Sequence, residues 1–292
     1  MTEFCITTDS GCDFPASLLA EHHIIAFPMR YAIDGVEFQD RMDPADMPGF
    51  YDKMRAGAAP VTSQMNPVDF LELWSKVYSE CHLPIIHIAL GSAISGTYAS
   101  GVQARQMFLE QHPDASVFVI DSTLASMSYG ILALAAAKLR DAGTSVEDSL
   151  SRLEELKHRI QAYFTTDDLT YLHRSGRVSK ASAVVASALN INPLLKLDKD
   201  GRLVVIEKIR GRKKALNRIY ELVSELVINP QEQTLYICHS DCKPEELKTI
   251  ADTLVARNGF TGSYVNFIGP IVGSHTGPGL VSVFFIGQPR TT

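Results

Sequence analysis

The sequence contains few of the features that mark secreted, disulfide-rich or membrane-spanning proteins. Its five cysteines include no C-x-x-C pair, and an odd number without short regular spacings does not form a disulfide framework, so we expect reduced thiols. No apolar run approaches the roughly 20 residues that span a bilayer. The N-terminal residues also lack the basic segment and apolar core of a signal peptide. We therefore expect a cytoplasmic protein without a membrane span, which makes at most transient contact with a membrane.

Positive charge is scarce as well. The chain has 27 Lys and Arg residues against 33 Asp and Glu residues, which gives a net charge of −6. This balance provides no overall positive field to hold a nucleic-acid backbone. Basic residues gather only locally, in KIRGRKK (208–214) and HRSGR (173–177), where a solvated basic face is the simpler interpretation. We expect no nucleic-acid partner.

Motifs for nucleotide phosphates and for metals are missing too. No P-loop or dinucleotide-type glycine pattern is present. The segment CHSDC (238–242) has no second cluster of ligands, so a core cysteine followed by a turn is favoured over a metal site. Asp9 and Asp13 in TDSGCD could hold a cation, but a turn closed by an Asp side chain at the end of a strand is the favoured interpretation. We expect no metal and no cofactor.

The first half of the chain has the pattern of an α/β domain. Length and composition, 292 residues of which 46% are hydrophobic, favour two domains. β-rich runs at 4–11, 24–33, 84–90 and 116–120 alternate with helical patterns at 66–80, 96–111 and 130–143. Such alternation predicts a mostly parallel sheet with helices on both faces, and ligands bind beyond the C-terminal ends of its strands.

The pattern changes after a charged helix predicted at 145–161. An Asp-Gly turn joins two strands within 189–209, which is a hairpin signal. Further strands are predicted at 233–240, 261–269 and 279–287, with helices at 212–227 and 244–258. We predict a second α/β domain with a mostly antiparallel sheet, and place the two domains at residues 1–160 and 161–292.

Two hydroxyl-rich loops precede helices in the first half. Thr62 and Ser63 lie in APVTSQMNP (59–67), just before a helix. The segment 86–100 runs from a buried strand into a helix through a polar loop that contains Ser92, Ser95, Gly96 and Thr97. Unpaired backbone N–H groups and the positive end of a helix favour an anion at such a junction, although helix capping explains any one of these hydroxyls.

A glycine-rich segment in the second half contains one histidine. IGPIVGSHTGPG (268–279) has four glycines and two prolines around His275, which Thr276 and Gly277 follow. We expect a loose, kinked loop that holds the imidazole over a group bound by the first domain. The alternative is a tight turn with an incidental histidine.

Seven short motifs, in this order along nearly the whole chain, resemble the DegV family of bacterial fatty-acid-binding proteins. They are ITTDSGCDFP at the start, TSQ at 62–64, SAISGTY at 92–98, VIDS at 119–122, RSGRVS at 174–179, EKIRGRKKAL at 207–216 and HTGPG at 275–279. The sequence departs from the family pattern at Ala93, where a second serine is usual, and at Met65 and Asn66, where proline usually follows TSQ.

The resemblance implies a two-domain α/β fold with a long-chain, palmitate-like fatty acid in a tunnel between the domains. It implies that Thr62, Ser95 and His275 bind the carboxylate. The supporting residues around them would be Ser63, Ser92, Gly96, Thr97, Thr276 and Gly277. It further implies a carrier rather than an enzyme, which presents the carboxylate to a separate ATP-dependent kinase for acyl-phosphate formation. Arg177 and Arg210 would contact that partner or the phosphate.

Elementary energetics agree with this expectation. Burial of a methylene group contributes roughly 0.8 kcal/mol, so about fourteen of them offer on the order of 11 kcal/mol before ordering costs. A carboxylate needs hydrogen-bond donors to enter an apolar tunnel. An alternative function is a serine acyl hydrolase that uses Ser95 and His275, but AISGT lacks the G-x-S-x-G elbow and no Asp is evidently paired with the histidine.

Overall fold

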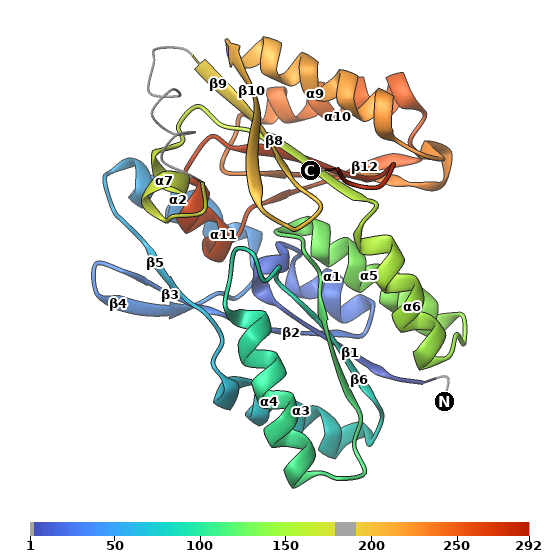
Figure 1. Ribbon diagram of the computed structural model, residues 1–292. Coiled ribbons are helices and arrows are strands. Elements are labelled where there is room, and N and C mark those ends of the chain that lie inside the picture. The colour runs from blue at the N-terminus through green and yellow to red at the C-terminus, as the bar shows by residue number, and fades with distance from the viewer. Residues whose placement is uncertain (1–2, 179–190, 292) are drawn as a thin grey trace.

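Two β-sheets of different type organise the molecule, and helices pack against them (Figure 1). The computed structural model describes residues 3–178 and 191–291. Sheet A has the strand order β2-β1-β6-β7 and consists of β1 (Cys5–Asp9), β2 (Ile24–Phe27), β6 (Ile85–Ala89) and β7 (Val117–Asp121). All its strand pairs are parallel, which confirms the prediction for the first half.

Helices lie on both faces of sheet A. They are α1 (Ala16–Glu21), α3 (Pro67–Cys81), α4 (Thr97–Gln111), α5 (Met127–Asp141) and α6 (Val146–Lys157). Helices α3 and α4 pack on one face through a core that includes Trp74 and Phe108, whereas α5 packs on the other through Leu132 and Ala136. Every residue of β6 is buried because helices cover both sides of the sheet.

Sheet C is built by the second half. Its strand order is β10-β9-β8-β13-β11-β12, and its strands are β8 (Ile160–Thr165), β9 (Ile191–Leu197), β10 (Leu203–Arg210), β11 (Thr234–His239), β12 (Gly262–Phe267) and β13 (Val281–Ile286). Only the β11–β12 pair is parallel among the described strands of this sheet, which confirms the mostly antiparallel prediction. The first two residues of the predicted hairpin at 189–209 and the last residue of the RSGRVS motif lie outside the described residues.

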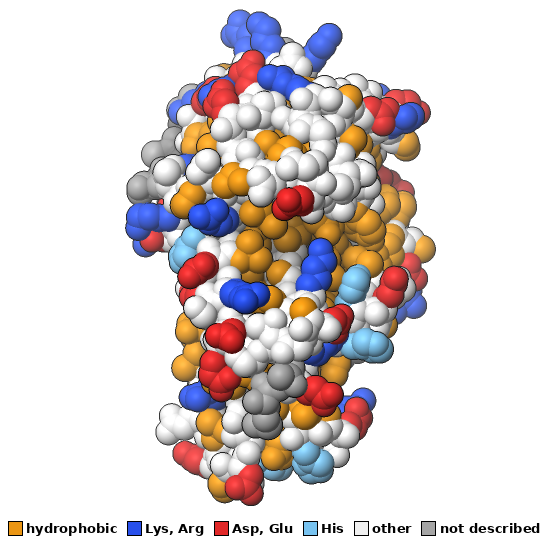
Figure 2. All heavy atoms as spheres, turned by 90° about the vertical axis from the view of Figure 1, so that its right-hand side faces the viewer, with side chains coloured by type: hydrophobic (Ala, Val, Ile, Leu, Met, Phe, Trp, Pro, Cys, Tyr) orange, Lys and Arg blue, Asp and Glu red, His pale blue; other side chains and the backbone are white. Residues whose placement is uncertain are grey.

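The two faces of sheet C have different neighbours. Helices α9 (Arg212–Leu226) and α10 (Pro244–Asn258) cover one face through a core that includes Ile219, Ile250 and Val283. The opposite face contributes Phe164, Leu197 and Phe284 to the core shared with sheet A. Figure 2 shows hydrophobic side chains gathered in a recess between the upper and lower parts of the molecule, while charged side chains are more frequent above and below.

A third, small sheet was not predicted. The run 24–33, predicted as one strand, is two strands in different sheets: β2 ends at Phe27, and β3 (Arg30–Ile33) pairs with β4 (Val36–Gln39) and β5 (Val61–Ser63) in sheet B. Pro28 separates them, because it cannot donate to a ladder and restricts the residue before it. The segment predicted as a loop at 59–67 therefore contains a short strand.

The glycine-rich segment around His275 is helical, so the prediction of a loose loop was wrong. Helix α11 (Pro270–Thr276) starts with a proline in its first turn, where a missing N–H is tolerated. A Cβ on Gly273 would lie 2.6 Å from the Tyr51 hydroxyl oxygen, so glycine permits close packing against helix α2 (Met47–Arg55). The remaining short helices are α2 (Met47–Arg55), α7 (Thr170–Arg174), and the 3₁₀ turns η1 (Ser10–Cys12), η2 (Pro44–Asp46) and η3 (Pro230–Glu232).

Candidate functional site

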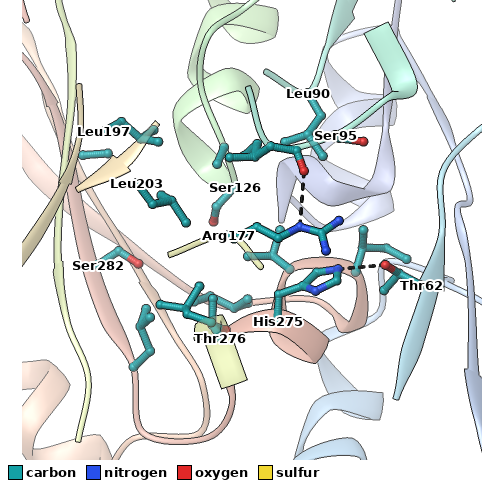
Figure 3. A pocket seen from close by; sticks show the side chains of 18 of the residues that line it. Thr62, Leu90, Ser95, Ser126, Arg177, Leu197, Leu203, His275, Thr276 and Ser282 are labelled. Atoms are coloured by element: carbon teal, nitrogen blue, oxygen red, sulfur yellow. Dashed lines mark hydrogen bonds between the residues drawn. The ribbon is translucent and has the colours of Figure 1, made fainter. Parts of the chain in front are cut away.

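A cavity of about 290 Å³ lies where the C-terminal end of sheet A meets the inner face of sheet C (Figure 3). Strand β5 and helix α11 close it from the side. Most of its wall is hydrocarbon, contributed by Met29, Leu90, Ile94, Ala125, Ala162, Phe164, Leu172, Leu197, Leu203, Ile268, Ile271, Val272, Leu280 and Phe284. Ligand cavities with apolar walls and a few convergent polar groups are the usual form of a small-molecule site.

Polar groups converge at one end of this cavity. Thr62 on β5 and His275 in the last turn of α11 are joined by a hydrogen bond of 2.8 Å between Oγ1 and Nε2. Ser95 lies in the turn before α4, where its hydroxyl donates to Thr97 Oγ1 over 3.0 Å. The structure therefore brings Thr62, Ser95 and His275 to the lining of one cavity.

Arg177 belongs to the same polar end. Its Nε donates to the Ile94 carbonyl over 3.3 Å (Figure 3). Its Nη1 donates to the Ser175 carbonyl over 2.5 Å. Burial, together with the smaller effect of the positive charge of Arg177, lowers the pKa of His275 to about 4. The imidazole is therefore neutral at neutral pH, and the guanidinium carries the positive charge at this end of the cavity.

Helix α11 is held in place from three sides. The backbone N–H of Gly269 donates to Asp13 Oδ1 over 2.8 Å, and the Tyr51 hydroxyl donates to the Ile268 carbonyl over 2.7 Å. Gly277 follows the helix at φ +73°, and a Cβ there would lie 2.2 Å from the Tyr171 ring. Gly277 has φ +73° and ψ 175°, a conformation essentially restricted to glycine, and the absence of a Cβ also permits the close contact with Tyr171. These contacts fix the position of His275.

The Ser95 turn depends on a similar close contact. A Cβ on Gly96 would lie 2.2 Å from Gln64 Oε1, so glycine leaves room for the amide end of the Gln64 side chain where it lies. Asn66 supports the same region because its side chain accepts hydrogen bonds from the first turn of α3, with Pro67 next in sequence. Asn66, which departs from the usual TSQ-Pro sequence, therefore serves as the N-cap of α3.

The other residues implied by the resemblance fall into two groups. Ser63, Gly96 and Thr276 line the cavity, whereas Ser92, Thr97 and Gly277 do not. Ser92 is exposed, and its hydroxyl and backbone N–H both donate to Asp121. Arg210 is also outside the cavity, exposed at the end of β10. The structure thus separates Arg177 from Arg210, which the sequence analysis grouped together.

Two further hydroxyls of the lining were missed. Ser126 is held at φ +57° and donates to Asp13, and Ser282 lies on β13. Neither belongs to a motif that the resemblance assigns to the ligand. Strand alternation gives the only signal for Ser282, because it shares its face with Phe284 and Leu280, which line the cavity.

The predicted absences concern metals and membrane spans. Within residues 3–178 and 191–291, no cluster of three His, Cys, Asp or Glu side chains has an arrangement suited to a metal ion. Asp9 forms the expected turn, because its side chain accepts from Gly11 N over 3.1 Å, and also accepts from the Tyr129 hydroxyl. No described helix combines the length and apolarity needed to cross a membrane.

Comparison with known proteins gives one consistent result. Residues 3–288 match the model of the DegV family, which is described as a family of uncharacterised proteins. A DegV domain-containing protein of Clostridium perfringens is 36% identical over 291 residues, 99% of each chain. The crystal structure of DegV from Bacillus subtilis, described as a fatty acid binding protein, has 30% identity and a TM-score of 0.84, over 98% of this chain and 99% of that one.

A second solved structure supports the same assignment. The DegV family protein of Thermus thermophilus, whose structure is described as showing fatty acid binding, has 27% identity and a TM-score of 0.85. The similarity covers 98% of this chain and all of the other. Because family model, relatives and folds agree over nearly the full length, this chain belongs to the DegV family.

Proposed function

We propose that this protein binds a long-chain fatty acid in the cavity between sheets A and C. The observation that carries the proposal is the form of that cavity, with hydrocarbon walls and one polar end formed by Thr62, Ser95, Arg177 and His275. An amphipathic acid with one charged end matches this division. The Bacillus subtilis and Thermus thermophilus relatives, which bind fatty acids, have the same fold.

The polar end suits a carboxylate. A buried carboxylate requires paired donors or a counter-charge, because an isolated charge is strongly disfavoured in an apolar environment. Hydroxyls of Thr62 and Ser95 and the neutral imidazole of His275 offer donors. Arg177 offers the charge, and charge-assisted hydrogen bonds are stronger than neutral ones. Arg177 would therefore serve the carboxylate directly as well as the phosphate.

We further propose that the protein is a cytoplasmic carrier that presents this carboxylate to an ATP-dependent kinase. Arg177, Ile94 and Leu203 also line a shallow hollow on the outside, together with Ser175, Gly176 and Arg202. The polar end of the cavity is therefore separated from this hollow by few side chains. A partner enzyme would reach the carboxylate from this hollow without unfolding of the protein around the cavity. The carrier alone would catalyse no reaction.

The hydrolase alternative is less well supported. Among the described residues, no hydrogen bond joins Ser95 to His275, since Ser95 donates to Thr97 and His275 Nε2 pairs with Thr62. A serine nucleophile needs a base within hydrogen-bond reach that is oriented by a third group. We expect no hydrolysis of acyl esters.

The test is a binding measurement on delipidated protein with hexadecanoic acid. Thr62→Val combined with Ser95→Ala removes two donors, and we expect at least ten-fold weaker binding. Thr249→Val combined with Ser79→Ala makes the same chemical changes on exposed faces of α10 and α3 and serves as the control. Unchanged affinity in the first pair would remove these residues from the site, and absence of binding by the wild type would refute the function.

A further inference from the structure

One polar side chain of the cavity lies away from the carboxylate end. Ser282 on β13 lines the wall and is only 4% exposed. In Figure 3 it lies across the cavity from Thr62, and its oxygen points inward. Within the described chain its hydroxyl has no hydrogen-bond partner. A buried serine whose hydroxyl lacks a protein partner and faces a cavity calls for an explanation.

The surroundings of Ser282 offer that hydroxyl nothing to bond. In the sheet register it lies between Phe164 of β8 and Cys238 of β11. Phe284 follows on the same face of its own strand, and Leu203 lines the cavity with it. The thiol of Cys238 is already directed to the Phe267 carbonyl. The Ser282 hydroxyl can therefore form a hydrogen bond only with a group inside the cavity.

Thr276, which also lines the cavity, has an unpartnered hydroxyl too, but its oxygen is fully buried instead of being open to the cavity. Thr276 Oγ1 is buried without a partner, in a residue that is 6% exposed. In Figure 3, Thr276 lies between His275 and Ser282. Of the two hydroxyls, only that of Ser282 is therefore open to a ligand in the cavity.

A plain hydrocarbon tail would not use these groups. It would cover Ser282 and strip it of water without returning a hydrogen bond, which disfavours binding. The need for a small residue does not explain a serine, because Ala162 on the adjacent strand β8 provides small size without a hydroxyl. A site built to hydrogen-bond a substituent discriminates strongly against a ligand that lacks it.

We propose that the preferred ligand is a long-chain fatty acid that carries a hydroxyl group on a carbon within its chain, and that Ser282 Oγ is the hydrogen-bond partner of this group. The inference rests on the proposed function, since it names the substrate class of the same cavity. Discrimination comes from one hydrogen bond made only by the substituted chain.

The experiment compares octadecanoic acid with a positional series of monohydroxy-octadecanoic acids on delipidated protein by titration calorimetry. We expect one isomer, or two adjacent ones, to bind the wild type at least ten-fold more tightly than octadecanoic acid. In Ser282→Ala, the ratio of affinities should fall to about one, and octadecanoic acid should bind at least as tightly as it does to the wild type.

A matched variant tests the position of the hydroxyl. Ala162→Ser adds a hydroxyl on the same sheet face one strand away, and in Ser282→Ala/Ala162→Ser we expect the preferred isomer to change. The inference is overturned if no hydroxy acid binds the wild type more tightly than octadecanoic acid. It is also overturned if Ser282→Ala keeps the wild-type ratio of affinities, which is the result expected if Ser282 binds only an ordered water. Both results would leave fatty acid binding intact. Binding of none of the acids would overturn the proposed function and this inference together.

Discussion

The side chains of Thr62 and His275 meet at 2.8 Å although 213 residues separate them in the sequence. Thr62 comes from the edge strand of sheet B and His275 from the helix that precedes β13. The contact therefore depends on the packing of both halves of the chain. It places a neutral imidazole at the polar end of the cavity, beside the guanidinium of Arg177.

This arrangement makes the titration of His275 a test of the carboxylate position. Burial, together with Arg177, holds the pKa of His275 at about 4. A bound carboxylate adds a negative charge beside the ring, which favours the protonated form, so the pKa should rise on binding. By linkage, the acid should bind more tightly as the pH falls from neutrality toward this window.

Nuclear magnetic resonance of the histidine ring protons, with and without octadecanoic acid, measures this change. His87 is the internal control, because it is fully buried against Thr7 outside the cavity and burial lowers its pKa to about 3. Identical His275 titration in the two forms would place the carboxylate elsewhere.

The separation of two arginines gives a second prediction. Arg177→Met keeps a long apolar stem but removes the half-buried charge, so we expect fatty acid binding to weaken about ten-fold or more. Arg210→Met changes an exposed side chain at the end of β10 and should bind the acid normally. With a bacterial fatty acid kinase and ATP, both variants should form less acyl phosphate. If both variants bind the fatty acid equally weakly, the assignment of Arg177, but not Arg210, to the carboxylate is contradicted.

Much of the fold could be predicted from the sequence, because helices and strands that are buried on one or two faces have a regular spacing of apolar residues. The run that forms β6 is apolar apart from the buried His87, as is typical of a central parallel strand, and α3 beside it has a clear apolar stripe. Sheet B was missed because β5 has three residues and β3 continues the apolar run of β2. Its existence depends on pairing between strands, which local pattern does not encode.

The site was only partly predictable for a similar reason. Glycine and proline disfavour a helix locally, yet α11 forms because Tyr51 and Asp13 hold it from outside. The depth of Arg177 in the cavity depends on the 175–177 backbone, and no periodicity marks it. The division at residue 160 stays a prediction, although β8 of sheet C begins at Ile160.

Two glycines that follow helices differ in both backbone and packing. Gly277 and Gly259 have positive φ, +73° and +81°, but ψ is 175° at Gly277 and 29° at Gly259, and only Gly277 has a neighbour, the Tyr171 ring, where a Cβ would lie. The Gly277 conformation is essentially restricted to glycine, whereas Gly259 lies in the left-handed region that other residues can adopt. Gly259→Ala should reduce stability by about 1 kcal/mol through backbone strain alone and leave fatty acid binding unchanged. Gly277→Ala should reduce stability more and weaken binding, because α11 or α7 must move. Urea unfolding and lipid titration on both variants measure the difference, and equal losses would contradict the packing argument.

The buried carboxyl of Asp40 predicts a dependence of stability on pH. Burial raises its pKa from 3.8 to about 6, although its side chain accepts a hydrogen bond from Met42 N. The folded state therefore holds this proton more tightly than the unfolded state. Its contribution to stability is full below about pH 4 and is lost as the pH rises through 6. Asp40→Asn keeps the acceptor oxygen and removes the titration.

The free energy of unfolding of Asp40→Asn minus that of the wild type should therefore be larger at pH 7.5 than at pH 4.5, by on the order of 1 to 3 kcal/mol. Urea unfolding at both pH values measures this difference. Asp43→Asn is the matched control, because Asp43 accepts from Ala45 N in the same loop but is exposed. We expect this control to follow the wild type at both pH values. A constant difference between Asp40→Asn and the wild type would contradict the prediction, because it would mean that the carboxyl titrates alike in the folded and unfolded chains.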